Sequence, residues 1–176
     1  PVDGTREFRF TGVPGIYSVL AGDELLDRVA VNAPVRESVL APVTDEALEL
    51  MAPWVDVLCS DIKSMRDDFY RDLCGAASVS QVLGSIAAGH RMGMHVETRT
   101  NVIPGRNDSP EELRAIARWI HDKLGAQSPW HITKFFPAYR LSEVPPTPSQ
   151  TLWAAHDAAR AEGLVNVYVY DDKGCD

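Results

Sequence analysis

From residue 44 onward, stretches rich in β-forming residues alternate with amphipathic stretches that carry helix start and stop signals. Four strands are expected, at Val55–Ile62, Met94–Ile103, Trp130–Phe136 and Leu164–Tyr170. Helices of about 10–15 residues that alternate with such strands are typical of right-handed βαβ units and a parallel sheet. The pattern therefore predicts an α/β fold over residues 44–170.

Capping residues and breakers mark the expected helix ends. Thr44 offers a capping hydroxyl ahead of two acidic residues, and Pro53 stops this first helix. Ser109 caps a long helix with Pro110 in its first turn, and Gly125 ends it. Further helices are expected at 66–73, 78–91 and 149–162.

About four βα units make half of an eight-fold TIM-type barrel, which typically needs about 250 residues. An isolated half would leave two long strand edges without partners. We therefore expect a partial barrel whose edges are covered by the first 43 residues, by a second copy, or by a missing N-terminal half.

The chain divides into three parts on this reading. Residues 1–43 form an unassigned segment of weak signal, with an apolar run at Ile16–Ala21 and a short helix expected near Asp23–Val31. Residues 44–170 form the half-barrel, and 171–176 a tail. Because the chain does not begin with Met, we expect it to start inside a longer reading frame or to have been trimmed.

Charge and cysteine usage narrow the class of protein. With 17 Lys and Arg against 25 Asp and Glu, the net charge is −8, which argues against nucleic acid or an anionic membrane as partner. No stretch reaches the roughly 18 apolar residues of a membrane span, and no charged-then-apolar leader opens the sequence, so secretion is not expected. Cys59, Cys74 and Cys175 have no zinc or disulfide spacing, so free thiols in a reducing cytoplasm are expected.

Reactive groups in parallel βα folds gather at the carboxyl ends of the strands. Asp61 and Lys63 are two residues apart, so on a strand they share one face. They could hold a polar ligand such as a ribose or an amino-acid head, or form an ion pair that closes the barrel mouth, and the spacing does not decide between these. Other strand ends carry Thr98, Arg99, Asn101, Lys134 and Tyr139.

Three further features leave alternatives open. Glu97 and Arg99 share one face of their strand, and Thr98 and Thr100 share the other. The sequence does not indicate which of these faces points inward. A desolvated Lys63 or Lys134 could form a Schiff base, although an ordinary paired lysine is the more frequent case. The loop 104–108 precedes a helix N-terminus and could bind an anion, but it lacks a full phosphate-loop pattern.

Six segments in order resemble radical S-adenosylmethionine (SAM) proteins of the pyruvate formate-lyase-activating type, best the subgroup called AmmeMemoRadiSam system radical SAM enzymes. They are T-D-E-A-L-E-L-M-A-P-W-V-D-V (44–57), S-D-I-K-S-M-R-D-D-F-Y-R-D-L-C-G (60–75), H-V-E-T-R-T-N-V-I-P-G-R-N-D-S (95–109), P-W-H-I-T-K-F-F-P-A-Y-R-L (129–141), V-P-P-T-P (144–148) and G-L-V-N-V-Y-V-Y (163–170). They are spread in this order over about 125 residues of the chain, from 44 to 170.

The resemblance implies a partial TIM-type barrel, a [4Fe-4S] cluster, and SAM, whose reductive cleavage releases a 5′-deoxyadenosyl radical that abstracts hydrogen from a substrate. In that family a D-x-K pair, here Asp61 and Lys63, helps to hold SAM. The V-I-P-G turn and the F-x-P-x-Y segment line the same mouth. The candidate SAM-facing residues are therefore Asp61, Lys63, Thr98, Val102, Pro104, Phe136 and Tyr139, with Phe136 standing where relatives often carry His.

The sequence departs from the family at the cluster. It contains no C-x-x-x-C-x-x-C motif and no G-G-E segment for the SAM amino group, and Leu40-Ala41-Pro42 replaces the usual T-N-G strand end. The three cysteines are too scattered to hold a cluster. We therefore expect a fragment or remnant of a radical SAM enzyme, from a truncated or frame-shifted reading frame, that is inactive alone. The alternatives are a non-catalytic binding or dimerisation module, and a Schiff-base lyase that uses Lys63 or Lys134.

Overall fold

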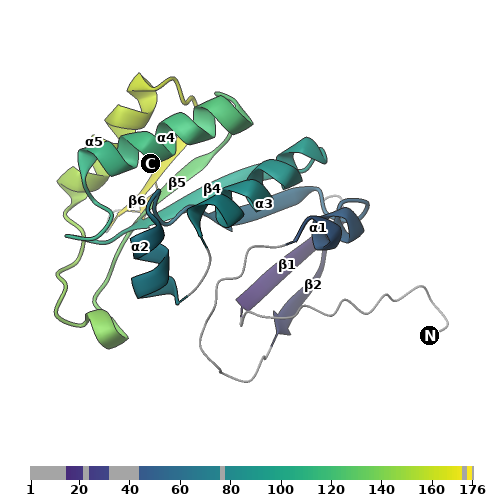
Figure 1. Cartoon of the computed structure of the whole chain (residues 1–176), viewed down its shortest axis with the longest axis horizontal. Helices are drawn as coiled ribbons and strands as arrows, with labels where there is room; N and C mark the ends of the chain where they lie inside the picture. The colour runs from purple at the N-terminus through teal and green to yellow at the C-terminus, as the bar shows by residue number, and fades with distance from the viewer. Residues whose placement is uncertain (1–14, 22–23, 32–43, 76–77, 172–173, 176) are drawn as a thin grey trace.

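The computed structural model describes residues 15–21, 24–31, 44–75, 78–171 and 174–175, and it contains two separate sheets (Figure 1). The larger sheet has the order β3-β4-β5-β6-β7, so strands that follow one another in sequence lie side by side. The first four strands are parallel and β7 is antiparallel to β6. The strands are β3 (Val57–Asp61), β4 (His95–Val102), β5 (Trp130–Lys134), β6 (Val167–Asp171) and β7 (Gly174–Cys175).

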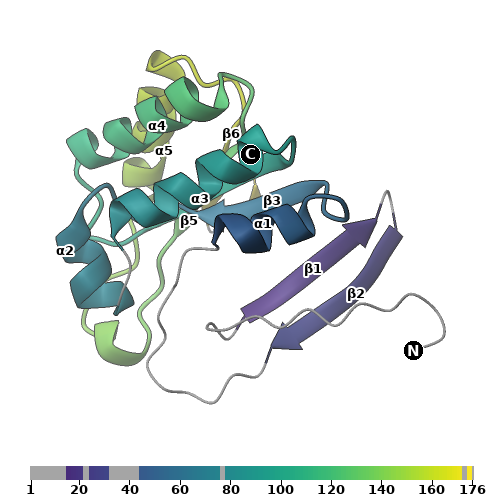
Figure 2. The same ribbon diagram turned by 45° about the vertical axis from the view of Figure 1, so that its right-hand side comes forward.

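Helices connect the parallel strands in the order that a barrel requires, which confirms the expected α/β fold of four parallel strands with interleaved helices. Figure 2 shows α3 running along the sheet, with α4 beside it. The elements are α1 (Asp45–Met51), α2 (Asp67–Phe69) with the π-helical turn η1 (Tyr70–Cys74), α3 (Val79–Arg91), α4 (Pro110–Leu124), the 3-10 turn η2 (Tyr139–Leu141) and α5 (Ser149–Ala161).

The helix ends follow the capping chemistry read from the sequence. The Thr44 and Ser109 hydroxyls accept backbone N–H groups at the starts of α1 and α4, and Pro110 occupies the first turn of α4. Gly75 and Gly125 have positive φ angles just after η1 and α4, where a side chain would strain the backbone. These local signals fix where the connections turn back toward the sheet.

Within the described residues, the helices pack on one face of the parallel sheet. Along β4 the exposure alternates, with Val96, Thr98, Thr100 and Val102 buried and His95, Arg99 and Asn101 exposed. Buried aliphatic residues of the three long helices pack against this side: Ile86, Ile116, Ile120 and Leu152. The threonines therefore point into the core, and Glu97 and Arg99 point to the other side, which we call the inner face.

A hydrogen-bond network joins three strands inside this core. The Trp130 indole is fully buried, and its Nε1–H donates to Thr100 Oγ1 at 2.9 Å. The Thr100 hydroxyl in turn donates to the Ile62 carbonyl at 2.7 Å. Because buried polar groups are costly without partners, this chain fixes the relative positions of β3, β4 and β5.

The expected helix near Asp23–Val31 is wrong. Residues Glu24–Val31 form strand β2, which pairs antiparallel with β1 (Gly15–Ala21) in the two-stranded sheet. The dipeptide Gly22-Asp23 between the runs is typical of hairpin connections, and Val29 and Val31 are β-branched. Pairing with the neighbouring strand β1 outweighs the helical preference of Glu24, Leu25 and Leu26.

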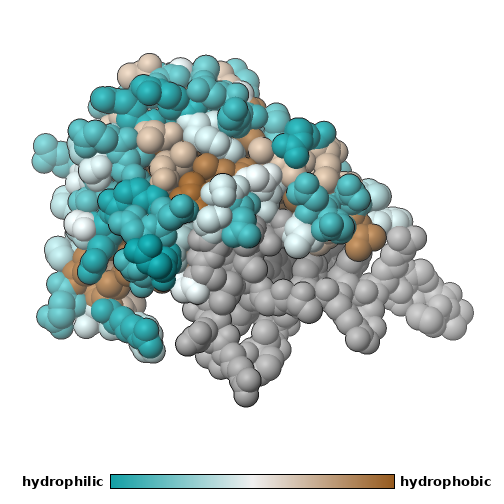
Figure 3. Space-filling view, viewed as in Figure 1, coloured by the Kyte–Doolittle hydropathy of each residue, from teal (hydrophilic) through white to brown (hydrophobic). Residues whose placement is uncertain are grey.

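The surface of the described residues is mainly hydrophilic in the view of Figure 3, with smaller hydrophobic areas between the polar side chains. Among the described helices, none is both long and apolar enough to cross a membrane. The most exposed of the large apolar side chains on this part of the chain lie on several different elements: Leu50, Trp54, Phe136, Tyr139 and Val165.

The Thr100→Val variant tests the core network. Losing the hydroxyl leaves the Trp130 N–H and the Ile62 carbonyl without a partner, and each such loss costs about 1–3 kcal/mol. We expect urea unfolding to show a free energy of unfolding about 2–4 kcal/mol lower than wild type. Thr133→Val is the control, because its hydroxyl makes one long bond of 3.3 Å, and it should cost less than about 1 kcal/mol. Equal losses in both variants would contradict a special role for Thr100.

Candidate ligand-facing inner face of the sheet

The inner face is lined by alternate residues of the four parallel strands, aligned across the sheet by the strand register. Val57, Cys59 and Asp61 of β3 lie opposite His95, Glu97 and Arg99 of β4. The same face continues through Asn101, His131, Thr133, Tyr168 and Tyr170. Most of these side chains are polar or ionisable, whereas the helix-covered face is mainly apolar.

At the carboxyl edge of this face, Asp61 holds two cations. Its Oδ2 lies 2.8 Å from Lys63 Nζ, and its Oδ1 lies 2.9 Å from Arg99 Nε. We call these three residues the Asp61 cluster. Burial by itself would raise the pKa of Asp61, but attraction to the Lys63 ammonium and hydrogen bonds from Lys63 and Arg99 outweigh it and hold that pKa below its ordinary value. With one carboxylate and two cations, the cluster carries a net charge of +1.

The turn after β3 fixes Lys63 through its backbone. The Lys63 N–H donates to the Tyr70 hydroxyl at 3.0 Å, and the Lys63 carbonyl accepts Nδ2–H of Asn107 at 2.6 Å. Asn107 also donates to the Asn101 carbonyl at the end of β4, at 3.0 Å. Burial raises the pKa of Tyr70 to about 12, so it stays a neutral phenol. Tyr70 and Asn107 are positioning residues that single-sequence reasoning missed, because neither lies in a strand.

In the turn after β4, two backbone N–H groups donate to side chains of the same turn. The Ile103 N–H donates to Asn107 Oδ1 at 2.6 Å, and the Gly105 N–H donates to Asp108 Oδ1 at 2.9 Å. Pro104 lies at the start of this turn and is half-buried. A loop that binds anions aims its N–H groups at the ligand, so these two bonds weigh against the anion-binding alternative for 104–108.

The segment after β5 begins at the same edge. Phe135 is buried and its N–H donates to Thr147 Oγ1 at 2.8 Å, while the Thr147 hydroxyl donates to the Val102 carbonyl at 2.5 Å. Phe136 and Tyr139 project into solvent, with exposed fractions of 58% and 85%. Two aromatic rings are thus presented beside the end of β5, where Lys134 Nζ lies 5.5 Å from the Phe136 ring centroid.

The structure does not bring all the candidate SAM-facing residues to one surface. Asp61 and Lys63 are in contact, and Arg99 joins them. Thr98 and Val102 lie in the core instead, and the Thr98 hydroxyl donates to the Pro129 carbonyl at 2.9 Å. SAM binding by any of these residues stays a prediction, as does Schiff-base chemistry at Lys63 or Lys134.

A second cluster lies on the inner face, formed by side chains of β4, β5 and β6. His131 Nε2 lies 3.1 Å from Glu97 Oε2, and His131 Nδ1 lies 3.0 Å from the Tyr170 hydroxyl. The His131 ring also stacks on Tyr168, with centroids 5.2 Å apart. We call these four residues the His131 cluster. Glu97 lies 34 positions before His131 and 73 before Tyr170, so no local sequence motif predicts the cluster.

The described residues do not fit a [4Fe-4S] cluster. Such a cluster needs several thiolates, and the described side chains include two cysteines, Cys59 and Cys74. Burial raises the pKa of both thiols, and the nearby Glu97 carboxylate raises that of Cys59 further. Within this part of the chain, no group of three His, Cys, Asp or Glu residues could hold a metal ion.

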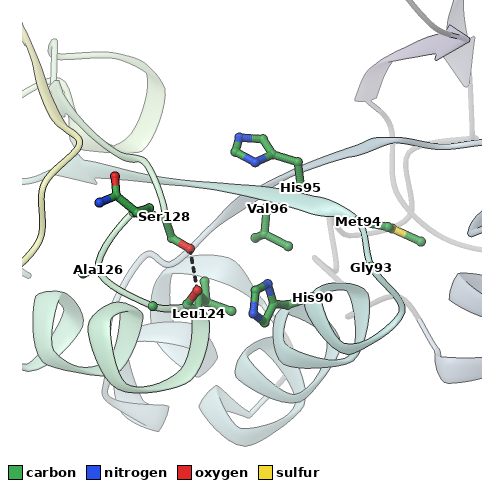
Figure 4. Close-up of a pocket in the computed structure, with 10 residues that line it drawn as sticks. His90, Gly93, Met94, His95, Val96, Leu124, Ala126 and Ser128 are labelled. Atoms are coloured by element: carbon green, nitrogen blue, oxygen red, sulfur yellow. Dashed lines mark hydrogen bonds between the residues drawn. The ribbon is translucent and has the colours of Figure 1, made fainter.

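A pocket of about 530 Å³ opens at the opposite, amino edge of the sheet. Figure 4 shows His90 and His95 there with Leu124 and Ser128, whose hydroxyl donates to the Leu124 carbonyl at 2.9 Å. The pocket lies between the loops that precede β4 and β5. Sites of parallel α/β folds lie at the carboxyl edge, so the Asp61 cluster is the better candidate.

Comparison with known proteins bears on the fold. No family model matches the chain. An uncharacterized protein of Methanocaldococcus jannaschii is 37% identical over 115 residues, which are 65% of this chain and 34% of that protein. The chain therefore spans about a third of the length of this curated relative.

Two solved structures have a similar fold. A domain of pyruvate-formate lyase-activating enzyme from Bacteroides vulgatus has a TM-score of 0.62 at 13% identity, covering 72% of this chain and 74% of that one. A radical SAM methyltransferase from Sphaerobacter thermophilus has a TM-score of 0.59 at 16% identity, covering 72% and 37%. The fold thus resembles a partial barrel domain of radical SAM proteins.

The Asp61→Asn variant tests the charge balance of the Asp61 cluster. The pKa of Asp61 is lowered by folding, so its contribution is fully present above the unfolded value of about 3.9 and is lost as pH falls through the folded pKa. We expect Asp61→Asn to lower the free energy of unfolding by about 1–2 kcal/mol at pH 7. The difference from wild type should shrink in urea titrations below about pH 4.

Asp72→Asn is the matched control for this measurement. Asp72 pairs with the adjacent Arg71 in solvent, with 62% of its side chain exposed. Such surface pairs contribute little, so the variant should change stability by less than about 0.5 kcal/mol. A loss in Asp61→Asn that is independent of pH would show that the carboxylate charge is not what matters.

Proposed function

We propose that this chain is the C-terminal part of a radical SAM enzyme of the pyruvate formate-lyase-activating type, in the AmmeMemoRadiSam subgroup. Its role is to supply the inner face that contacts SAM and substrate. The observation that carries the proposal is the Asp61 cluster at the carboxyl edge of a sheet whose fold resembles radical SAM domains. The six sequence segments that resemble the family are arranged along this same sheet.

The Asp61 cluster suits the amino-acid end of SAM. The cluster has a net positive charge and side-chain donors that suit a carboxylate, while Asp61 itself can accept from an ammonium group. Phe136 and Tyr139, exposed beside the end of β5, offer apolar surface for a ring. The hydrogen bonds of the Lys63 backbone with the Tyr70 hydroxyl and the Asn107 amide hold Lys63 in place before a ligand arrives, which lowers the entropy cost of binding.

The iron–sulfur cluster is not assigned to this chain. In the intact family it supplies the electron that cleaves SAM, and here the described donor set does not fit it. We propose that another part of the enzyme holds the cluster, on a preceding half-barrel. That half-barrel would pair with β3, the edge strand of the sheet. Alone, this chain would bind SAM without cleaving it.

The SAM proposal is tested by equilibrium dialysis of the chain against labelled SAM. We expect Lys63→Met to weaken SAM binding about tenfold or more, since it removes a charged donor worth about 1.4 kcal/mol or more. Lys123→Met, which removes an exposed lysine of α4, is the control and should bind like wild type. Wild-type and Lys63→Met chains that bind SAM equally would exclude the Asp61 cluster as the SAM site.

Iron and acid-labile sulfide per chain, measured after anaerobic reconstitution, test the assignment of the cluster. We expect near-zero iron and no visible charge-transfer absorption, because the thiols of Cys59 and Cys74 resist ionisation. About four irons per chain with matching sulfide would contradict the proposal. Gel filtration of the same sample reports whether a second copy takes the place of the preceding half-barrel.

A further inference from the structure

The His131 cluster has a geometry that determines where its protons lie. The Glu97 carboxylate only accepts hydrogen bonds, so His131 Nε2, 3.1 Å away, carries the proton in the neutral imidazole. Nδ1 is then an acceptor, and the Tyr170 hydroxyl 3.0 Å away donates to it. The order of donors is therefore Tyr170 to His131 to Glu97, across three adjacent strands.

Neighbouring side chains of the inner face hold the His131 ring and the Glu97 carboxylate in position. Tyr168 stacks on His131 with an angle of 19° between the rings, which fixes the plane of the imidazole. Arg99 is the cross-strand neighbour of His131 on β4. His95 lies 3.6 Å from the second oxygen of Glu97. The imidazole is more enclosed than the groups at its two ends, with 19% of its side chain exposed against 34% for Glu97.

We propose that Tyr170 is a catalytic acid–base group on the inner face, with His131 and Glu97 as its positioning residues. Its substrate would be a small anion that also carries an ionisable O–H or N–H group. The cations of the Asp61 cluster lie on the same sheet face, through Arg99, and would attract the anionic end. The inference shares one assumption with the proposed function, that ligands bind on the inner face of the sheet.

The proton step balances within the chain and the substrate. The substrate X–H bond breaks, and its proton goes to the Tyr170 oxygen while the bonding electrons stay on X. The original Tyr170 proton passes to Nδ1 of His131, whose lone pair forms the new N–H bond. The resulting imidazolium is stabilised by the Glu97 carboxylate at 3.1 Å, as in other carboxylate-oriented histidines. The reverse sequence returns the proton to the product.

The test is imidazole and phenol NMR of the whole chain with two probes that differ by one hydroxyl group, glycolate and acetate. We expect glycolate to shift the His131 ring and Tyr170 hydroxyl signals at least twice as far as acetate does at equal concentration. Tyr170→Phe should abolish the difference between the probes. Tyr168→Phe, which keeps a ring stacked on His131, should retain it.

Two results would overturn the inference. One is an equal response to glycolate and acetate, which would leave the cluster as packing. The other is a glycolate-specific shift that persists in Tyr170→Phe. Dialysis with SAM separates this inference from the proposed function: a chain that fails to bind SAM but shows the glycolate-specific response refutes the SAM proposal alone. A chain that binds SAM but responds equally to glycolate and acetate refutes the Tyr170 acid–base proposal alone.

Discussion

The packing of helices on a single face of the parallel sheet is the constraint that organises this chain. Because strand side chains alternate, covering one face directs every second residue of these strands toward the helices, as the alternating burial of β4 shows. Val96, Trp130 and Val169 fill that side, and nearly all of their surface is buried. The residues between them lie outside the apolar core, so charged side chains can occupy these positions at little cost in stability.

The two faces treat polar groups differently for the same physical reason. On the helix-covered face, the Thr98 and Thr100 hydroxyls donate to main-chain carbonyls, which makes them tolerable in an apolar core. Among the described residues, no buried side-chain nitrogen or oxygen lacks a hydrogen-bond partner. On the inner face, polar groups such as Asp61 and His131 pair with ionisable side chains of neighbouring strands instead. Polar groups serve the fold on one side and are available to chemistry on the other.

How far a single sequence predicts this structure depends on whether each signal is local. Helix ends were predictable because a cap such as Ser109 and a stop such as Gly125 act within one turn. The spacing of Asp61 and Lys63 predicted that they share one face of the strand, and left open whether they form the ion pair that the structure shows. The face of Thr98 was not, since both faces of β4 carry polar residues and only helix packing distinguishes them. The β2 strand was missed because its stability depends on pairing with β1, and the helical propensity of its own residues contains no information about that partner.

The His131 cluster shows the same limit at the level of the site. Its members come together only through cross-strand register, which no residue specifies alone. That register also has a consequence for assembly. If a preceding half-barrel covers the inner face, Glu97 and Arg99 lose water, and a buried charge without a partner is strongly destabilising. Both already have hydrogen-bond partners within this chain, His131 and Asp61, so the barrel can close over them without leaving either group unpaired.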